Sequence, residues 1–332
     1  MNNKLKICIF GANGLVGTKM LEVLHERHLV SHGSISLVAT DTSVEMGNRS
    51  NHLDRFEFTR DVKIIKASDA IKLNHDVVLM SARAPASMEW APKFVNAGAV
   101  VIDNSSAWRI NDDVELAVYG VSKLHSGRNS RIISNPNCVA IMVATAIAPL
   151  VRFGIKHISV TAMQAISGMG KAALDEFKKE VDIYSKGYYS PVPSRFFNQI
   201  GPASIRGLKP NSNQEEDKGN MEIQKIFGDK FLTSFRSLRA SVEHGHVADV
   251  RITLRKDVSI PEVIEALENG SNIRLYHDDV PLSHALDQDK CIVWGVRVGS
   301  DDFKTIELVA MSDNLRLGAA SNAVSIMEQI FS

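Results

Sequence analysis

The sequence predicts an α/β protein: a Rossmann-type nucleotide-binding domain plus an α+β domain with a mixed, largely antiparallel sheet. Three observations favour this fold: a glycine turn between a strand and a helix near the N-terminus, several short apolar runs after that turn, and longer candidate strands later in the chain. Runs that are apolar on both faces are typical of parallel sheets covered by helices on each side. With 332 residues, the chain has room for two domains.

The glycine turn is part of a strand-turn-helix unit. Residues 6–10 are apolar enough for a buried strand, the run GANGLVG follows at 11–17, and apolar residues from Val16 to Leu24 recur at helical spacing. Backbone N–H groups at a helix N-terminus bind phosphate, and glycines let a pyrophosphate approach closely. The turn therefore predicts dinucleotide binding, with a plain tight turn as the alternative because GxxGxxG departs from the commoner GxGxxG.

Further apolar runs complete the two predicted sheets, and the pattern changes from about residue 134. The runs assigned to the parallel sheet are 6–10, 35–38, 62–65, 77–80, 100–102 and 132–133. The longer strands assigned to the second sheet are 158–165, 247–254, 291–298 and 304–310. We predict a dinucleotide-binding domain at 1–133 plus 314–332, and a catalytic and dimerisation domain at 134–313.

Other segments are predicted from local signals. The run SIPE at 259–262 has the spacing of a capping box, which predicts a helix over 261–269. Residues 207–220 are polar and lack an apolar period, which predicts a surface loop. Apolar residues at helical spacing from Ala320 to Phe331 predict a final helix.

Composition restricts the kinds of partner that we expect. The 38 basic and 38 acidic side chains balance, which argues against a nucleic-acid or polybasic membrane surface, and no apolar run is long enough to span a bilayer. The apolar stretch at 5–10 is too short for a signal peptide, so we expect a cytoplasmic protein with a small-molecule substrate. Cys8, Cys138 and Cys291 lie far apart without CxxC spacing, which predicts a reduced compartment and no metal site.

Cys138 follows Asn-Pro-Asn at 135–137 and is the candidate nucleophile. A thiolate can hold an acyl group as a thioester, while the alternative for a free cysteine is a small buried hydrophobe. A histidine within reach, from the run EHGH at 243–246, would activate the thiol. Gln164 ends a predicted strand just before a second turn of small residues at 167–170, and Arg109 ends a polar run whose guanidinium suits phosphate or carboxylate.

These segments resemble the aspartate-β-semialdehyde dehydrogenase family. The resemblance runs in the family's order over nearly the whole chain, through 11–17, 103–109, 135–138, 164–170, 222–225, 239–246 and 313–320. It implies reversible NAD(P)H-dependent reductive dephosphorylation of L-aspartyl-β-phosphate to L-aspartate β-semialdehyde in aspartate-family amino-acid biosynthesis. It also implies a homodimer formed through the sheet of the second domain.

The resemblance implies a role for each catalytic residue. Cys138 would attack the acyl phosphate, release inorganic phosphate and leave a thioester for reduction by hydride. His246 would act as the acid and base, and Gln164 would orient the acyl intermediate. The side chain of Asn137 and the N–H of Cys138 would stabilise the oxyanion.

Substrate and cofactor positions are also implied. Arg239 would bind the α-carboxylate and Glu222 the α-ammonium, whereas Arg109 and Lys225 would hold the phosphate. Glu222 and Lys225 stand three apart, so on a helix they share a face. The cofactor positions, with Gly11 and Asp41 added from the motifs themselves, are Gly11, Asn13, Gly14, Leu15, Val16, Thr40, Asp41, Ser167, Gly168 and Asn314.

Several positions depart from the family pattern. Relatives place an arginine where Thr42 stands, for the 2′-phosphate of NADP, whereas Asp41 suits the 2′-hydroxyl of NAD. NADP is the cofactor implied by the resemblance, and NAD stays open as the alternative. Arg83 replaces a small residue. The same chemistry on another acyl phosphate, such as N-acetylglutamyl phosphate, therefore stays open, as does a non-catalytic nucleotide-binding paralogue.

Overall fold

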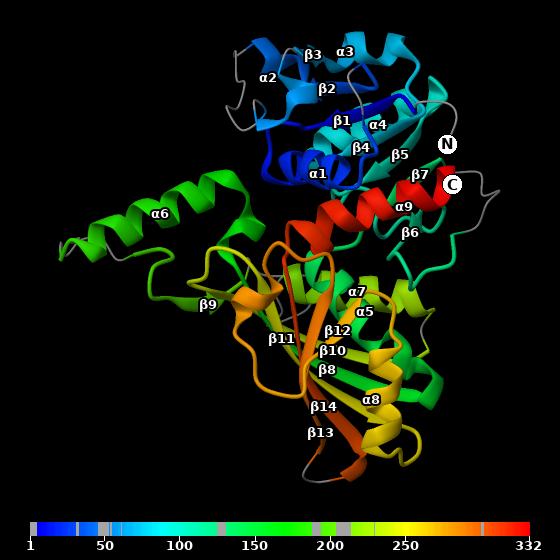
Figure 1. Ribbon diagram of the computed structural model, residues 1–332, viewed down its shortest axis with the longest axis vertical. Helices are drawn as coiled ribbons and strands as arrows, with labels where there is room; N and C mark the ends of the chain where they lie inside the picture. The colour runs from blue at the N-terminus through cyan, green and yellow to red at the C-terminus, as the bar shows by residue number, and fades with distance from the viewer. Residues whose placement is uncertain are drawn as a thin grey trace. The chain divides into compact units, whose positions relative to one another are not determined.

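The chain forms two compact units in the computed structural model (Figure 1). The first unit falls within 1–136 and 319–332, and the second within 137–318. The structure describes residues 5–30, 33–45, 53, 55–60, 62–124, 131–187, 194–203, 214–228, 230–299 and 302–332.

The first unit contains a seven-stranded, wholly parallel sheet in the order β3-β2-β1-β4-β5-β7-β6. Its strands are β1 (Ile7–Phe10), β2 (Ile35–Ala39), β3 (Ile64–Lys66), β4 (Val77–Met80), β5 (Val100–Asp103), β6 (Glu115–Leu116) and β7 (Ile132–Ser134). Its helices are α1 (Leu15–Glu26), α2 (Asp41–Glu45), α3 (Ala67–Ala70), α4 (Ala84–Asn96) and α9 (Ser321–Phe331). The parallel sheet predicted from the short apolar runs is confirmed.

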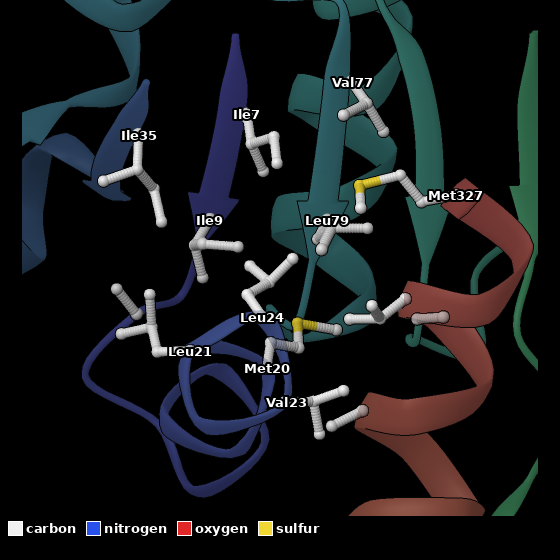
Figure 2. Close-up of a cluster of buried hydrophobic side chains, with 14 of the residues drawn as sticks. Ile7, Ile9, Met20, Leu21, Val23, Leu24, Ile35, Val77, Leu79 and Met327 are labelled. Carbon is white, nitrogen blue, oxygen red and sulfur yellow. The ribbon is translucent and has the colours of Figure 1, made fainter. Parts of the chain in front are cut away.

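Successive side chains of a strand point to opposite faces of the sheet, and apolar clusters cover both faces of this one. Ile7 and Ile9 of β1 join one apolar cluster with α1 and α9, and Cys8 and Phe10 join another with α3 and α4. Figure 2 shows the first cluster, in which side chains from α1 point toward the strands and Met327 approaches from α9. Cys8 therefore belongs to the core.

The C-terminal helix α9 packs beside α1 within the first unit. The guanidinium Nη1 of Arg27, at the end of α1, donates to Ser325 Oγ at 2.9 Å and to Glu328 Oε2 at 2.6 Å. The final helix predicted from its apolar spacing is confirmed, and its apolar side faces the sheet.

The second unit contains a seven-stranded mixed sheet in the order β12-β13-β14-β11-β8-β10-β9. Among the strand pairs of the described residues, β8/β10 and β12/β13 are parallel and the others antiparallel, so the prediction of a mixed, largely antiparallel sheet is confirmed. Its strands are β8 (Ile155–Gln164), β9 (Ile200–Pro202), β10 (Leu232–Ala240), β11 (His246–Leu254), β12 (Ile273–Leu275), β13 (Cys291–Gly299) and β14 (Asp302–Ser312). Its helices are α5 (Cys138–Ile147), α6 (Lys171–Ser185), α7 (Gln214–Phe227) and α8 (Ile260–Glu268).

Helix α5 is the central element of this unit, because it packs on α7 and on the strands β11, β13 and β14. Residues 139–147 are all buried, so the helix lacks a polar face. The predicted capping box of α8 is confirmed, since Glu262 Oε2 accepts from the N–H of Ser259 at 3.0 Å and Ser259 Oγ accepts in return.

The prediction of a surface loop at 207–220 is wrong for residues 214–220, which form the start of α7; residues 207–213 lie outside the described residues. The buried side of this first turn is polar, which explains why no apolar period marks it. Glu216, only 4% exposed, accepts from the N–H of Ser237 at 3.1 Å and lies 3.5 Å from Arg236 Nη1. Acidic residues also suit a helix N-terminus.

Candidate active site

Cys138 is the first residue of α5, and Asn137 caps the helix. The side-chain Oδ1 of Asn137 accepts from the N–H of Val139 at 2.9 Å, which satisfies one of the N–H groups that a helix N-terminus leaves without an intrahelical partner. Cys138 is partly exposed, unlike the buried Cys8 and Cys291. The positive end of a helix dipole favours the thiolate form of a cysteine, so this position suits a nucleophile.

His246 is the first residue of β11 and faces the thiol. Its Nε2 lies 3.0 Å from Cys138 Sγ, and its Nδ1 accepts from the backbone N–H of Ala165 at 3.0 Å. The ring is wholly buried. Burial, followed by the charge of Arg239, lowers the pKa of His246 to about 3, although Glu215 acts in the opposite direction. The imidazole is therefore neutral at physiological pH.

Arg239, near the end of β10, is held by backbone carbonyls. Its Nη1 donates to the carbonyl of Ala165 at 2.6 Å and its Nη2 to that of Ala203 at 3.1 Å. Burial lowers the pKa of Arg239, while the charges of Cys138 and Glu215 raise it. Its Nε is buried and has no hydrogen-bond partner among the described residues, which leaves a donor for an anionic ligand.

Gln164, the last residue of β8, lies opposite Arg239 in the parallel β8/β10 pair. It is 2% exposed, and its side-chain Nε2 has no hydrogen-bond partner in the part of the chain that the structure describes. A buried donor left unsatisfied costs about 1–3 kcal/mol. The amide N–H of Gln164, which lies beside Arg239, is therefore suited to donate a hydrogen bond to a bound substrate.

Ser167 and Asn314 support the segment that carries the imidazole. Asn314 Nδ2 donates to Ser167 Oγ at 3.0 Å, and Asn314 Oδ1 accepts from the N–H of Gly245 at 2.9 Å. Gly168 lies against the ring, since a Cβ built on it would be 3.3 Å from His246 Cε1 and from Arg239 Nη1. These three predicted cofactor residues thus surround the buried histidine.

Helix α7 places two glutamates beside Asn137. Glu222, 1% exposed, accepts from the backbone N–H of Asn137. Glu215 accepts from Asn137 Nδ2 at 2.9 Å and pairs with Lys218 at 2.6 Å. Burial would raise the pKa of Glu215, but Lys218 and Asn137 outweigh it and hold that pKa below its ordinary value.

Sequence reasoning missed Glu215 and Lys218. They have the same Glu-x-x-Lys spacing as Glu222 and Lys225 and lie two turns earlier on the same helix. This repeated spacing is the sequence pattern that could have identified them. Glu215 also interacts electrostatically with Arg239 and His246, whereas Lys225 is half-buried farther along α7.

Arg109 lies in the first unit, where backbone carbonyls orient it. Its Nε donates to the carbonyl of Asn135 at 3.0 Å and its Nη2 to that of Asn104 at 2.7 Å. The loop itself is fixed by Asp103, a buried carboxylate that accepts from Ser105 Oγ at 2.6 Å. The polar run before Arg109 therefore serves to hold the guanidinium in place.

The glycine turn between β1 and α1 is too closely packed for side chains at two of its glycines. Gly11 has a φ of +89°, and a Cβ on it would lie 2.8 Å from Ser81 Oγ; a Cβ on Gly17 would lie 2.3 Å from the carbonyl oxygen of Gly11. Gly14 caps α1 and makes no side-chain cap hydrogen bond, and Asn13, Leu15 and Val16 lie next to it at the N-terminus of the helix. This arrangement fits a dinucleotide.

Thr40 and Asp41 lie at the end of β2. Thr40 Oγ1 accepts from the N–H of Ser43 at 3.3 Å, and Asp41 Oδ1 accepts from the N–H of Ser68 at 3.2 Å. Desolvation raises the pKa of Asp41, but the hydrogen bonds from Ser68 and the charge of Lys66 lower it by more. Asp41 is therefore a carboxylate at neutral pH.

A glycine-cradled nucleotide fold and a thiol paired with a buried imidazole define a class: oxidoreductases that combine a dinucleotide with a cysteine. Residues 6–130 match the family model described as semialdehyde dehydrogenase, NAD binding domain, and residues 147–317 match the one described as semialdehyde dehydrogenase, dimerisation domain. The chain belongs to the aspartate-semialdehyde dehydrogenase family, as its sequence motifs indicate. The first unit is accordingly its NAD-binding domain, and the enzyme uses a nicotinamide dinucleotide.

Individual relatives agree with the family models. Aspartate-semialdehyde dehydrogenase 2 of Vibrio cholerae is 33% identical over 99% of this chain and 98% of its own length. The aspartate-semialdehyde dehydrogenase of Aquifex aeolicus is 31% identical over 97% of each chain. A crystal structure of aspartate semialdehyde dehydrogenase II from Vibrio cholerae has a TM-score of 0.88 at 31% identity and covers 99% of both chains; a second structure of that protein is a complex with ASA.

The described residues contain neither a metal-binding cluster nor a helix that could cross a membrane. In those residues, we find no cluster of three or more histidine, cysteine or carboxylate side chains that could hold a metal ion. None of the helices in the same residues combines the length and the apolar character needed to cross a membrane.

Proposed function

We propose that the protein catalyses the reversible, NAD(P)H-dependent reductive dephosphorylation of L-aspartyl-β-phosphate to L-aspartate β-semialdehyde, with Cys138 as nucleophile. One observation carries the proposal: at the N-terminus of α5, Cys138 Sγ lies 3.0 Å from Nε2 of the buried His246. Relatives named aspartate-semialdehyde dehydrogenase support the substrate.

The thiolate of Cys138 attacks the acyl carbon, so that a C–S bond forms while the bond from carbon to the phosphate oxygen breaks. A nicotinamide dinucleotide, when bound, would supply the hydride that reduces this thioester. The oxyanion formed at each step is stabilised by the backbone N–H of Cys138 and by donors near it, each worth about 3 kcal/mol in comparable sites. Gln164, whose side-chain Nε2 has no hydrogen-bond partner among the described residues, donates to the acyl group.

Substrate charges are matched by residues of β10 and α7. Arg239 binds the α-carboxylate through its unpaired Nε and remaining N–H groups. We assign the α-ammonium to Glu215 in place of Glu222, because Glu222 is fully buried on the backbone of Asn137 while Glu215 interacts with Arg239. Lys218 pairs with Glu215 and adds the positive charge that a phosphate needs. Roles for Arg109 and Lys225 in phosphate binding stay predictions.

For the cofactor, we propose that NADP is used and that NAD is also accepted. Asp41 is charged and suits the ribose of NAD, while the charge of Lys66 attracts Asp41 and reduces its repulsion of a 2′-phosphate. The test is a steady-state comparison of NAD⁺ and NADP⁺, with Thr42→Arg as the control. Thr42→Arg should raise preference for NADP⁺; an unchanged ratio would contradict this placement of the ribose.

Activity tests the proposed reaction directly. The protein should reduce NAD(P)⁺ with L-aspartate β-semialdehyde only when inorganic phosphate is present, and Cys138→Ala should abolish the reaction. Normal turnover by Cys138→Ala would overturn the mechanism. N-acetylglutamate semialdehyde is the comparison substrate, since its acetylated amine carries no charge for Glu215; a preference for it would replace the aspartate assignment.

We also propose a homodimer formed through the outer face of the second sheet. This face carries Leu232, 66% exposed, and Met163, 38% exposed, on adjacent strands β10 and β8. The match to a dimerisation domain supports this face as an interface. Met163→Glu should shift the sedimentation coefficient from dimer to monomer, whereas Met88→Glu, an exposed position in the first unit, should leave it unchanged.

A further inference from the structure

We propose that Asp313 is a positioning residue that holds Cys138 and His246 at their separation of 3.0 Å, because each of its two carboxylate oxygens fixes the backbone behind one member of the pair. Asp313 acts through the protein backbone and has no part in binding the substrate. The inference rests on the proposed function, since it takes Cys138 and His246 as the reacting pair.

The carboxylate of Asp313 is buried and accepts three backbone hydrogen bonds. The residue follows β14 directly and is 4% exposed. Its Oδ1 accepts from the N–H groups of Leu315 at 2.8 Å and Arg316 at 3.0 Å, and its Oδ2 accepts from that of Asp287 at 3.0 Å. A buried charge is costly unless it is hydrogen-bonded, and hydrogen bonds to a charged acceptor are stronger than neutral ones. One side chain therefore fixes two segments that are 26 residues apart in the sequence.

The first oxygen, Oδ1, holds the turn that lies behind the nucleophile. It accepts from N–H groups at the start of the π-helical turn Arg316–Ala320, as a capping side chain does at a helix N-terminus. The carbonyl oxygen of Asp313 also accepts from the N–H of Gly318 in this turn. Gly318 adjoins the Cβ of Cys138 so closely that a side chain does not fit between them. A shift of the turn would therefore change the position open to the thiol.

The second oxygen, Oδ2, holds the loop that packs behind the imidazole. Leu282 and Leu286 precede Asp287 in this loop and lie against Gly245, where an added Cβ would be 2.9 Å and 3.0 Å from their methyl carbons. Gly245 immediately precedes His246 in the sequence. The bond from the N–H of Asp287 to Oδ2 therefore anchors the loop that limits where the imidazole can move.

The neighbours of Asp313 contact the same part of the site. Ser312 lies opposite His246 in the antiparallel β11/β14 pair, and Asn314 Oδ1 accepts from the N–H of Gly245 at 2.9 Å. The segment 312–314 thus borders the backbone of the histidine, while the side chain at 313 reaches both the turn and the loop. Misplacement of reacting groups by about 1 Å can cost a factor of about 100 in rate. Asp313 is consequently placed to affect the rate through alignment alone.

The kinetics of Asp313→Ala provide the first test. We expect kcat to fall by about 100-fold. The KM for the semialdehyde should stay close to the parental value, because lost alignment acts on the transition state and not on ground-state binding. Ser259→Ala is the matched control, since it removes the cap of α8 and lowers stability within the same unit. Its kcat should be parental, and a parental kcat in Asp313→Ala would overturn the proposal.

Alkylation of Cys138 by iodoacetamide gives a second readout that needs no substrate. Cys8 and Cys291 are fully buried, so alkylation of the folded protein reports on Cys138. The thiolate is the reactive form, and its place at the N-terminus of α5 beside His246 favours it. We expect alkylation of Asp313→Ala at neutral pH to be about tenfold slower, with its pH profile moved up by about one unit. A carboxylate that serves only stability would leave the profile unchanged, as in Ser259→Ala, and that result would contradict the proposal.

Asp313→Asn decides the question even if Asp313→Ala does not fold. Its amide oxygen can still accept from the turn, but its NH₂ group would face the N–H of Asp287, so the anchor of the loop is lost. We expect kcat to fall by about tenfold, together with slower alkylation. Parental values of both in Asp313→Asn would overturn the proposal. An inactive parent on aspartate semialdehyde, with the expected changes in alkylation, would overturn only the proposed function.

Discussion

Gly318 lies directly against Cys138: a Cβ built on Gly318 would be 2.8 Å from the Cβ of the cysteine. The glycine belongs to the π-helical turn Arg316–Ala320, where its N–H donates to the carbonyl of Asp313 at 3.1 Å. The backbone of Gly318 thus limits the position of Cys138 on one side, and only a residue without a side chain fits there. Space beside Cys138 is as much a part of the site as the groups that contact it.

Gly318→Ala should displace the thiol, because no flexible atom can move out of the way. Since small misplacements of reacting groups are costly, we expect kcat/KM to fall by about 100-fold while cofactor affinity is kept. Steady-state kinetics and cofactor titration are the measurements. Gly201→Ala, where an added methyl group meets nothing within 4 Å, is the control. An active Gly318→Ala would mean that α5 shifts freely.

Glu215 and Glu222 should give different phenotypes although they share a helix. Glu215→Gln keeps the hydrogen bond to Asn137 Nδ2 but loses the charge, so we expect a KM for the semialdehyde raised about tenfold with normal stability. Glu222→Ala leaves the buried N–H of Asn137 unsatisfied and should lower the free energy of unfolding by about 1–3 kcal/mol. Kinetics and urea unfolding of both variants distinguish the two roles, and exchanged phenotypes would reverse the assignment.

Gly11→Ala should weaken both nucleotide binding and folding. The positive φ of +89° costs an alanine about 1–2 kcal/mol, and its methyl group would contact Ser81 at 2.8 Å. We expect a lower melting temperature and a cofactor Kd raised at least tenfold. Gly98 also has a positive φ but open space around it, so Gly98→Ala should lose stability only. Equal cofactor affinity in the two variants would argue against a phosphate at Gly11.

Glu180 of α6 should make the stability of the 194–197 segment depend on pH. Burial raises its pKa, but N–H donors from Phe197, Arg195 and Phe196 and the hydroxyl of Ser194 lower it by more. A carboxyl whose folded pKa is depressed stabilises above its unfolded value, here 4.5, and that stability is lost as pH falls through the folded pKa.

Hydrogen exchange of the amides at 195–197 measures this effect. Exchange should accelerate as pH falls below 4.5, after correction for intrinsic rates, and Glu180→Gln should already show fast exchange at neutral pH. Glu176, which contacts Arg195 only at its exposed guanidinium, is the control position for a Glu→Gln change. Identical protection in the two variants would rule out a special role for Glu180.

Sequence patterns predict those parts of the fold that are marked by local features, such as glycine turns and apolar periodicity. The glycine turn and the apolar runs predict the parallel sheet, because its central strands β1 and β4 are buried on both faces and α1 carries one apolar stripe. Helix α5 gives no such signal, since it is apolar on every side. The start of α7 gives none either, because its buried side carries Glu216 and Asp217. Sequence periodicity cannot reveal a face whose burial depends on polar partners elsewhere in the chain.

The sequence predicted the type of site, a cysteine with a nearby histidine, but it did not identify every residue of the site. Motif order identified Cys138 and His246, whose side chains the structure brings within hydrogen-bond distance. It could not separate Glu215 from Glu222, because the same spacing occurs twice on one helix. The N–H of Ala165 donates to Nδ1 of His246, and a backbone group of this kind is present in every sequence. Only the three-dimensional structure shows where such a group points.

The contact of Arg27 with Ser325 and Glu328 has a consequence for biosynthesis. The first unit needs α9, and α9 follows every residue of the second unit in the sequence, so residues 137–318 leave the ribosome before the first unit can be completed. Chains stalled before α9 emerges should therefore carry a formed second unit and an unfinished nucleotide-binding sheet, whose uncovered apolar face is a target for chaperones.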